Sequence, residues 1–307
     1  MFTYYLNLAL RSFKRNKALT ALMVLAIALG IGASMTTLTV FHVLSGDPIP
    51  QKSDRLFYVQ MDPEPMRGYR PGEEPQAQMT RFDSETLLRQ KRGLRQTLTT
   101  GGNLVVSSDK PGVSPRLVDA RYASSDFFPM FDVPFQFGQG WDAAADEGPQ
   151  PVVVLDHETN EKVFGGANSV GQTIKLGKVE YRVVGVLKPW APSPKFFDLN
   201  NGSFEDAEHA YVPYGWGKTL ELPVYGNTNC WKPESGETYQ DFLNSECVWL
   251  QLWAELPTAA DRSYVRSLMV PCYERGKIAN WISPPKQGVD NKPFDWEYIK
   301  FHQVDAE

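Results

Sequence analysis

A long run without charged side chains dominates the hydrophobic pattern near the start of the chain. Residues 18–44 contain no Asp, Glu, Lys or Arg. As a helix with a rise of about 1.5 Å per residue, this run would be about 40 Å long. It could cross a hydrocarbon core of about 30 Å, either tilted or with its ends among the headgroups. The pattern predicts a transmembrane helix from Ala18 to Leu44.

Four basic residues and no acidic ones precede this run: Arg11, Lys14, Arg15 and Lys17. Because basic flanks stay on the cytoplasmic side of a span, the bias predicts a cytoplasmic N-terminus, with everything after Leu44 exported. Apolar residues also recur at helical spacing upstream of the run, mostly opposite the basic ones. This is typical of an interfacial helix over residues 1–17, although a plain extension of the spanning helix has the same spacing.

A cleaved secretory signal is the competing interpretation of the same segment, because it also begins with basic residues before an apolar run. The apolar region of such a signal has roughly 7–15 residues, which is shorter than the run here. The best small-residue exit, Gly30 to Gly32, also lies in the middle of the run instead of at its end. A retained membrane anchor is therefore favoured.

Small residues form stripes along the predicted span. Ala26, Gly30 and Ser34 recur at every fourth position, and Gly32 belongs to a neighbouring stripe. Small side chains let another transmembrane helix approach closely, whereas a solitary anchor needs no such face. We therefore expect helix packing at these four residues, although small residues are frequent in membrane helices in general.

The exported part alternates between apolar and polar residues in short segments. Strands are predicted over residues 55–61, 96–106, 116–122, 151–155, 170–176, 179–187, 247–256 and 296–304. Helices are predicted over residues 125–130, 160–164 and 259–275, the last with Thr258 as N-cap, and between an N-cap at Asp83 and a stop at Gly93. Gly177 and Lys178 separate two of the strands, which is typical of a two-residue hairpin turn. The prolines and glycines of residues 63–75 predict a long loop.

This order of elements predicts an α+β fold. Strands and helices alternate at both ends of the exported part, and short strands dominate between them. The expected parts are an interfacial helix at 1–17, a transmembrane helix at 18–44, the first half of an α+β domain at 45–123, an inserted and mostly β subdomain at 124–213, and the second half of the α+β domain at 214–307.

The charge of the exported part excludes one class of partner. The whole chain carries a formal net charge of −5, and the first 17 residues contribute +4, so residues 45–307 carry −9. A nucleic-acid-binding domain needs a basic face for phosphate contacts, and this acidic part has no such surplus. We therefore expect a membrane-associated protein with no nucleic-acid partner.

Two near-matches to catalytic motifs each lack the residue that carries the chemistry. Residues 166–173 resemble a phosphate-binding loop, but Gln172 stands where that motif needs Lys. His157 and Glu158 begin like a zinc-protease helix, yet Glu161 occupies the position of the second histidine, so this segment is predicted to be a solvated turn. The four histidines are far apart in sequence and no Gly-x-Ser-x-Gly elbow occurs. We expect no catalytic residue, no cofactor and no metal site.

All three cysteines lie in the exported part, where thiols can oxidise and stay oxidised. Cys230 and Cys247 flank a polar stretch containing Gly, Pro and Ser, a loop that a crosslink could hold. We predict a disulfide between them, which would contribute about 3 kcal/mol by loop entropy. Three unpaired buried thiols are the alternative, and the sequence assigns no role to Cys272.

Several blocks of the sequence resemble one family of membrane proteins. Residues 8–17 followed by residues 25–32 resemble the first transmembrane helix of MacB-type ABC transporter permeases, the class of macrolide exporters and lipoprotein-release systems. The segments at 131–140, 152–155, 163–165, 170–174, 181–186 and 210–213 are similar to successive blocks of that family's periplasmic core domain. The resemblance implies a Porter-like α+β part with a β-rich Sabre-like insertion, on the periplasmic side of a bacterial inner membrane.

The resemblance also implies partners. It implies a separate ATP-binding subunit whose motion the chain relays, further transmembrane helices or a second permease copy in a dimer, and a periplasmic adaptor. Permeases of this class continue into three more membrane helices, and no apolar stretch after Leu44 approaches 18 residues. The chain is therefore expected to be part of a longer permease, or to work with helices that another polypeptide supplies.

A membrane-anchored periplasmic ligand-binding or sensor module is the second hypothesis, because it needs only an anchor and a cleft. Aromatic residues could line such a cleft, although a domain core or a partner interface explains them equally well. These residues are Trp190, Phe196, Phe197, Tyr211, Tyr214 and Trp216.

Overall fold

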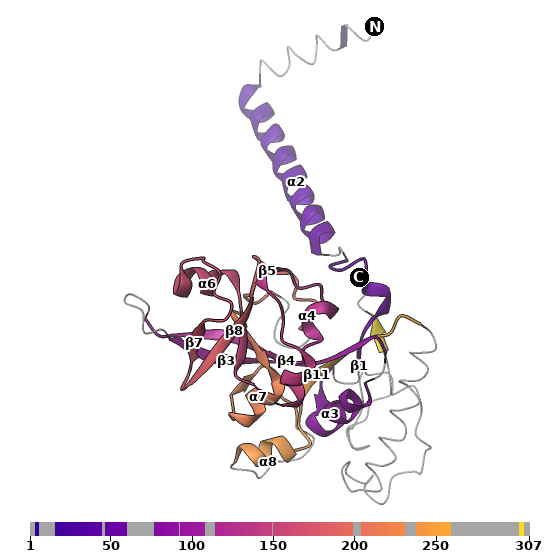
Figure 1. The fold of residues 1–307 in the computed structure, drawn as a ribbon. Coiled ribbons are helices and arrows are strands. Elements are labelled where there is room, and N and C mark those ends of the chain that lie inside the picture. The colour runs from indigo at the N-terminus through magenta and orange to yellow at the C-terminus, as the bar shows by residue number, and fades with distance from the viewer. Residues whose placement is uncertain are drawn as a thin grey trace, which may run out of the picture. The chain divides into compact units, whose positions relative to one another are not determined.

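The computed structural model describes residues 4–5, 16–44, 47–59, 77–91, 93–107, 114–148, 150–198, 204–230, 238–258 and 301–303. Contacts divide the chain into two units, one of Met1–Gly46 with Ala306–Glu307 and one of Asp47–Asp305. The first unit contains a long helix, and the second contains a sheet with short helices packed on it (Figure 1).

Helix α2 (Lys17–Leu44) forms the described part of the first unit. Among the described residues it is the one helix long and apolar enough to cross a membrane, by length and composition. Four of its hydroxyl groups, those of Ser34, Thr36, Thr37 and Thr39, do not need water, because each donates to the carbonyl four residues earlier. Ser34 Oγ lies 2.9 Å from Gly30 O, and Thr39 Oγ1 lies 2.8 Å from Met35 O. Such internal bonds let polar side chains lie in an apolar surrounding.

The strands of the second unit hydrogen-bond into one continuous network. They are β1 (Leu56–Val59), β2 (Met79–Thr80), β3 (Arg95–Ser107), β4 (Arg116–Ala123), β5 (Phe135–Gly138), β6 (Val152–Leu155), β7 (Thr173–Leu176), β8 (Val179–Leu187), β9 (Ala210–Pro213), β10 (Val224–Tyr225), β11 (Val248–Glu255) and β12 (Phe301–Gln303). The main order is β12-β1-β11-β3-β4-β9-β6-β8-β5. Along it, the pairs β4–β9 and β6–β8 are parallel and the other pairs are antiparallel.

Short helices cover both faces of this sheet. They are α3 (Arg81–Gln90), α4 (Phe127–Met130), α5 (Ala143–Glu147), α6 (His157–Phe164), α7 (Tyr214–Thr219) and α8 (Tyr239–Asn244), and a 3₁₀ turn, η1, covers Ser53–Arg55. Figure 1 shows α4 on one side of the sheet and α3, α7 and α8 on the other. The strands therefore present apolar side chains in both directions.

The alternation of side chains along β1 and β11 explains the two apolar cores that these strands supply, one on each face of the sheet. Leu56 and Trp253 pack with the aromatic residues of α4, whereas Phe57 and Leu252 pack with α3 and α8. Successive residues of a strand point to opposite faces, so each strand supplies both cores. Phe127 is fully buried at the centre of the α4 side.

The predicted α+β class and most predicted strands are confirmed. The strands at 96–106, 116–122, 151–155 and 247–256 correspond to β3, β4, β6 and β11, with ends that differ by at most one residue. The hairpin of β7 and β8 turns at Gly177 and Lys178 as predicted, with Leu176 paired to Val179. The division at residues 124 and 213 stays a prediction, since hydrogen bonds run through the sheet without interruption there.

Two helix starts differ from their predictions because the capping residue lies earlier in the chain. Helix α3 is capped by Thr80, whose Oγ1 accepts from the backbone of Asp83, so Asp83 is not the N-cap. Helix α6 begins at His157 instead of Asn160, because Asp156 caps it by accepting from the Thr159 amide at 2.8 Å. The predicted turn around His157 is thus helical. The predicted loop at 63–75, the helix at 259–275 and most of 1–17 and 296–304 lie outside the described residues.

Candidate functional site

The small residues predicted to pack against another helix all lie on α2. An ideal Cβ built on Gly30 or on Gly32 meets no atom within 4 Å, and the side chains around them are exposed. Ala26 and Ser34 extend the same open surface. The surface is therefore available to another helix, and its role in packing stays a prediction.

The residues predicted to set the topology are placed only in part. Lys17 is the first residue of α2 and is exposed. Arg11, Lys14 and Arg15 lie outside the described residues. The cytoplasmic position of the N-terminus therefore stays a prediction that rests on the sequence.

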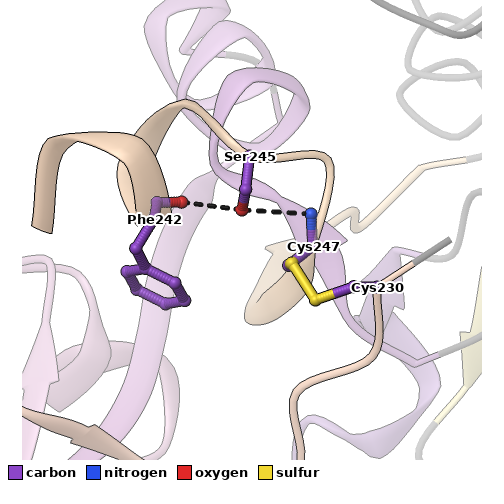
Figure 2. Close-up of a disulfide and its surroundings, with 4 residues drawn as sticks. All are labelled: Cys230, Phe242, Ser245 and Cys247. Atoms are coloured by element: carbon purple, nitrogen blue, oxygen red, sulfur yellow. Dashed lines mark hydrogen bonds between the residues drawn. A yellow bond between two sulfur atoms is a disulfide. The ribbon is translucent and has the colours of Figure 1, made fainter. Parts of the chain in front are cut away.

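Cys230 and Cys247 form the predicted disulfide (Figure 2). Cys247 is 2% exposed and directly precedes β11, which lies in the core. Asn229, beside Cys230, forms a β-bridge with Val248, so the covalent bond and a pair of backbone hydrogen bonds hold the same two segments together.

Hydrogen bonds extend this crosslink to helix α8. The amide of Cys247 donates to Ser245 Oγ at 3.3 Å, and that hydroxyl donates to the carbonyl of Phe242 at 2.7 Å (Figure 2). The disulfide and these hydrogen bonds therefore connect three pieces of chain: the residues around Cys230, the end of α8 and the start of β11.

A groove of about 650 Å³, which is not among the predicted features, lies between helices α3, α5 and α7. An ion pair connects two of its walls: Lys91 Nζ, at the end of α3, lies 2.7 Å from Glu147 Oε1, at the end of α5. The exposed side chain of Leu94 also lines the groove. The groove is assembled from elements far apart in sequence, so no local pattern could have revealed it.

Buried carboxylates in the groove wall are held by fixed donors. Glu85 Oε1 accepts from Lys218 Nζ at 2.7 Å and from the Tyr214 hydroxyl at 3.0 Å. Burial alone raises the pKa of Glu85, but the hydrogen bond and charge of Lys218 more than offset it and lower the pKa. Asp146 accepts from Trp141 Nε1 at 3.1 Å, and burial raises its pKa above the ordinary value. These groups stabilise the wall through contacts within the protein.

Asp156, Glu158 and His209 approach one another closely enough to resemble a metal-binding group, with ligand atoms within 4.8 Å. Each is already engaged, however. Asp156 caps α6 and lies 3.0 Å from His209 Nδ1, and Glu158 pairs with Lys162 and lies 3.6 Å from Arg116. Together with Lys162 and Arg116 these residues form an ion-pair network, and the absence of a metal site stays a prediction.

Most of the aromatic residues considered for a ligand cleft do not line the groove between α3, α5 and α7. Trp190, Phe196, Phe197 and Tyr211 pack in the aromatic cluster around Phe127. Tyr214 lines the groove, and Trp216 is partly buried against a third apolar core, which contains Tyr122, Val153 and Tyr181. Most of these aromatic residues thus belong to the domain core and do not line a ligand cleft. The segment 166–173 leads into β7 and not into a helix, as expected for a turn without a phosphate site.

The sequence model of the MacB-like periplasmic core domain matches residues 20–263. The chain belongs to this family. MacB-like periplasmic core domains are parts of ABC-type transporter permeases, which are not classical enzymes. The resemblance that the sequence blocks indicated is therefore confirmed, and the second unit of this MacB-like chain is a domain of the periplasmic type on a membrane-anchored protein.

Two curated proteins are similar to shorter stretches of the MacB-like chain. The "Macrolide export ATP-binding/permease protein MacB" of Acinetobacter baylyi is 32% identical over 107 residues, which is 34% of this chain and 14% of that protein. "Benzoyl-CoA oxygenase component B" of Aromatoleum evansii is 48% identical over 61 residues, which is 20% of this chain and 13% of that protein. The matched part of the chain thus spans about a seventh of each relative.

Among solved structures, the periplasmic region of MacB from Actinobacillus actinomycetemcomitans is similar to this chain, with a TM-score of 0.44 and 14% identity. The alignment covers 74% of the MacB-like chain and 87% of that structure.

Proposed function

We propose that the chain is the N-terminal and periplasmic portion of an ABC-type export permease. In this proposal α2 spans the bacterial inner membrane with its N-terminus in the cytoplasm, and the chain relays the motion of a separate ATP-binding subunit to the periplasmic domain. The family match carries the proposal, because it begins at residue 20, inside α2, and continues through the sheet to residue 263. The helix and the domain thus belong to one family unit.

The path of the chain through the domain supports this arrangement. Strands β1 and β12 are antiparallel neighbours, with Phe57 opposite Gln303 and Val59 opposite Phe301. Gln303, the last residue of β12, therefore lies opposite Phe57, near the start of β1. The chain enters and leaves the sheet at the same end of the same edge. A domain carried between membrane helices needs its two connections close together in this way.

The open face of α2 supports a helical partner in the membrane. Ala26, Gly30 and Ser34 leave space for a neighbouring backbone, and Gly32 does so on the next stripe. Further transmembrane helices of the permease, or a second copy in a dimer, would fill this space. A periplasmic adaptor would bind the domain from outside.

Co-purification tests the proposal. The chain is expressed together with its cognate ATP-binding subunit, extracted in mild detergent and passed over a size-exclusion column. We expect the two proteins to co-elute, with ATP hydrolysis in the shared peak. Elution of the ATP-binding subunit separately from a well-folded chain, at every detergent tried, would contradict the relay.

The groove between α3, α5 and α7 favours a second candidate, a membrane-anchored ligand-binding or sensor module. Its volume of about 650 Å³ is in the range of small-molecule sites. Native mass spectrometry of the chain, extracted from its own membranes, separates the two functions. A small molecule bound one to one, without any ATP-binding subunit, would favour the sensor.

A further inference from the structure

Residues 47–55, which precede β1, are folded as a stiff turn. Asp47 Oδ1 accepts from the amide of Ile49 at 2.9 Å, and Asp47 Oδ2 accepts from Ser53 Oγ at 2.5 Å. The amides of Lys52 and Ser53 both donate to the carbonyl of Ile49, at 2.9 and 3.0 Å. Proline on either side of Ile49 fixes two further φ angles. A flexible tether would have none of these restraints.

Ile49 anchors this turn in the domain. Its side chain is 2% exposed and belongs to the aromatic cluster that also contains Phe127, Phe131 and Trp253. The first apolar residue of the described segment that follows α2 is therefore a core residue. Any displacement of the turn must move the core with it.

Lys52 fastens the same turn to the end of helix α4. The residue is only 8% exposed, and Lys52 Nζ donates to Pro129 O at 2.5 Å, to Met130 O at 3.3 Å and to Asp132 Oδ1 at 2.5 Å. An ammonium group has three donors, and all three are used here. The last carbonyls of a helix lack partners within it, so Lys52 satisfies groups that α4 cannot satisfy itself.

The partner carboxylate is held in place as well. Asp132 has a positive φ of 49°, and its Oδ2 accepts from Gln51 Nε2 at 2.9 Å. Burial alone raises the pKa of Asp132, but the hydrogen bonds from Lys52 and Gln51 lower it further than burial raises it. On the other side of the turn, Arg55 Nε lies 2.9 Å from Glu255 Oε1, and the amide of Leu256 donates to Arg55 O at 2.7 Å.

We propose that Lys52 makes residues 47–55 and helix α4 a single rigid joint, through which a displacement of α2 reaches the sheet. Lys52 is thus a positioning residue of the relay. The drive for such a displacement rests on the proposed function, whereas the rigidity of the joint is a property of this chain alone. The two parts can therefore fail separately.

Hydrogen exchange of the full chain in detergent micelles tests the rigidity. The variant Lys52→Met keeps the unbranched stem and removes the three donors. We expect roughly 10- to 100-fold faster exchange, as for loss of hydrogen bonds to a charged group. The faster exchange should occur together at the amides of Lys52, Ser53 and Leu56 and at those of Phe131 and Val133, which close the end of α4.

The matched control is Lys91→Met, which removes the ammonium of an exposed ion pair with Glu147 elsewhere in the domain. It should leave both segments of the joint unchanged. The inference is overturned if Lys52→Met accelerates only one of the two segments, or neither, or if Lys91→Met has the same effect. If Lys52→Met unfolds the domain, the variant Asp132→Asn is tested instead. The joint then requires faster hydrogen exchange both in residues 47–55 and at the end of α4, while the amides of β3 and β11 stay protected.

A second measurement tests the relay in the assembled complex with the ATP-binding subunit. The wild type should show a nucleotide-dependent change in hydrogen exchange at β1 and α4, and Lys52→Met should lose it while ATP hydrolysis continues. Retention of the change in Lys52→Met would overturn the joint and leave the proposed function intact. Absence of a complex would contradict the proposed function and leave the exchange test of the joint unaffected.

Discussion

Arg121 and Glu208 form an ion pair that is sealed inside the domain, with Arg121 Nε 3.0 Å from Glu208 Oε1 and neither side chain more than 1% exposed. Arg121 lies on β4, and Glu208 precedes β9, the parallel neighbour of β4. Asp198 accepts a further bond from Arg121, and Lys195 Nζ lies 3.4 Å from Glu208 Oε1. Two cations and two anions thus balance in the interior and attach the segment after β8 to the sheet.

The first prediction concerns this buried pair. Arg121→Met should lower the free energy of unfolding by about 3–5 kcal/mol, because it leaves the carboxylates of Asp198 and Glu208 buried without their main cation. Urea denaturation of the full chain in mild detergent, followed by tryptophan fluorescence, measures the loss. Arg89→Met is the matched control, since the side chain of Arg89 is 65% exposed and its ion pair with Glu85 is loose. An equally small decrease in the free energy of unfolding in both variants would contradict a stabilising role for the buried ion pair.

The elements that the sequence predicts well are those with local signals. Alternation alone locates β3 and β11, a run of four apolar residues locates β6, and Gly177 with Lys178 marks the hairpin of β7 and β8. The helix starts were less accurate, although their signals are local too. Thr80 and Asp83 have the spacing of a capping box, as do Thr238 and Asp241 before α8, but neither pair is among the predicted helix starts.

What the sequence could not supply is the proximity of distant residues. Arg121 and Glu208 are 87 positions apart and meet only because β4 lies beside β9. Lys52 and Asp132 are 80 positions apart and meet only because the turn after α2 packs under α4. Hydrophobic periodicity fixes which face of a strand is buried, but it does not fix which strands become neighbours. The disulfide was predictable because its two cysteines are only 17 positions apart and a polar stretch of sequence separates them.

The second prediction concerns that disulfide. The double variant Cys230→Ser, Cys247→Ser should be about 3 kcal/mol less stable than the wild type without reductant, as loop entropy predicts for this separation. Addition of a reductant should lower the wild type to the level of the variant and leave the variant unchanged. Cys272→Ser is the control and should not remove the effect of the reductant. Alkylation in denaturant adds an independent check: equal numbers of modified thiols before and after reduction would refute the bond.

The third prediction concerns pH. The hydrogen bond that His209 donates to Asp156, with smaller contributions from the charges of Asp156 and Glu158, raises the pKa of His209 above 6.5, against the opposing effects of burial and Arg116. A raised pKa in the folded state stabilises the protein fully below the unfolded value, and this contribution disappears as the pH rises through the folded pKa. His209→Gln should therefore lose more stability at about pH 5.5 than at about pH 8.5, by about 1 kcal/mol or less.

Urea midpoints across this pH range measure the effect of His209. The control is Asp156→Asn, which retains a good helix N-cap and removes the charge that faces His209. Asp156→Asn should abolish the pH dependence of stability that His209 causes. It should not cause the loss of stability expected when α6 has no N-cap. A stability difference between wild type and His209→Gln that grows toward alkaline pH would show that the sign is wrong.

The last prediction concerns the open face of α2. Gly30→Ile with Ser34→Ile should weaken association between transmembrane helices by about 1 kcal/mol or more, because branched side chains keep a neighbouring backbone at a distance. The substitutions create no clash within the chain, since a Cβ on Gly30 meets nothing within 4 Å. They also leave no unpaired donor, because the Ser34 hydroxyl that bonds to Gly30 O is removed. A transmembrane association assay in a bacterial membrane measures the effect, with Leu25→Ile and Leu29→Ile as volume-conserving controls. If all variants associate equally, Gly30 and Ser34 do not form the packing face, and Gly32→Ile then tests the neighbouring stripe.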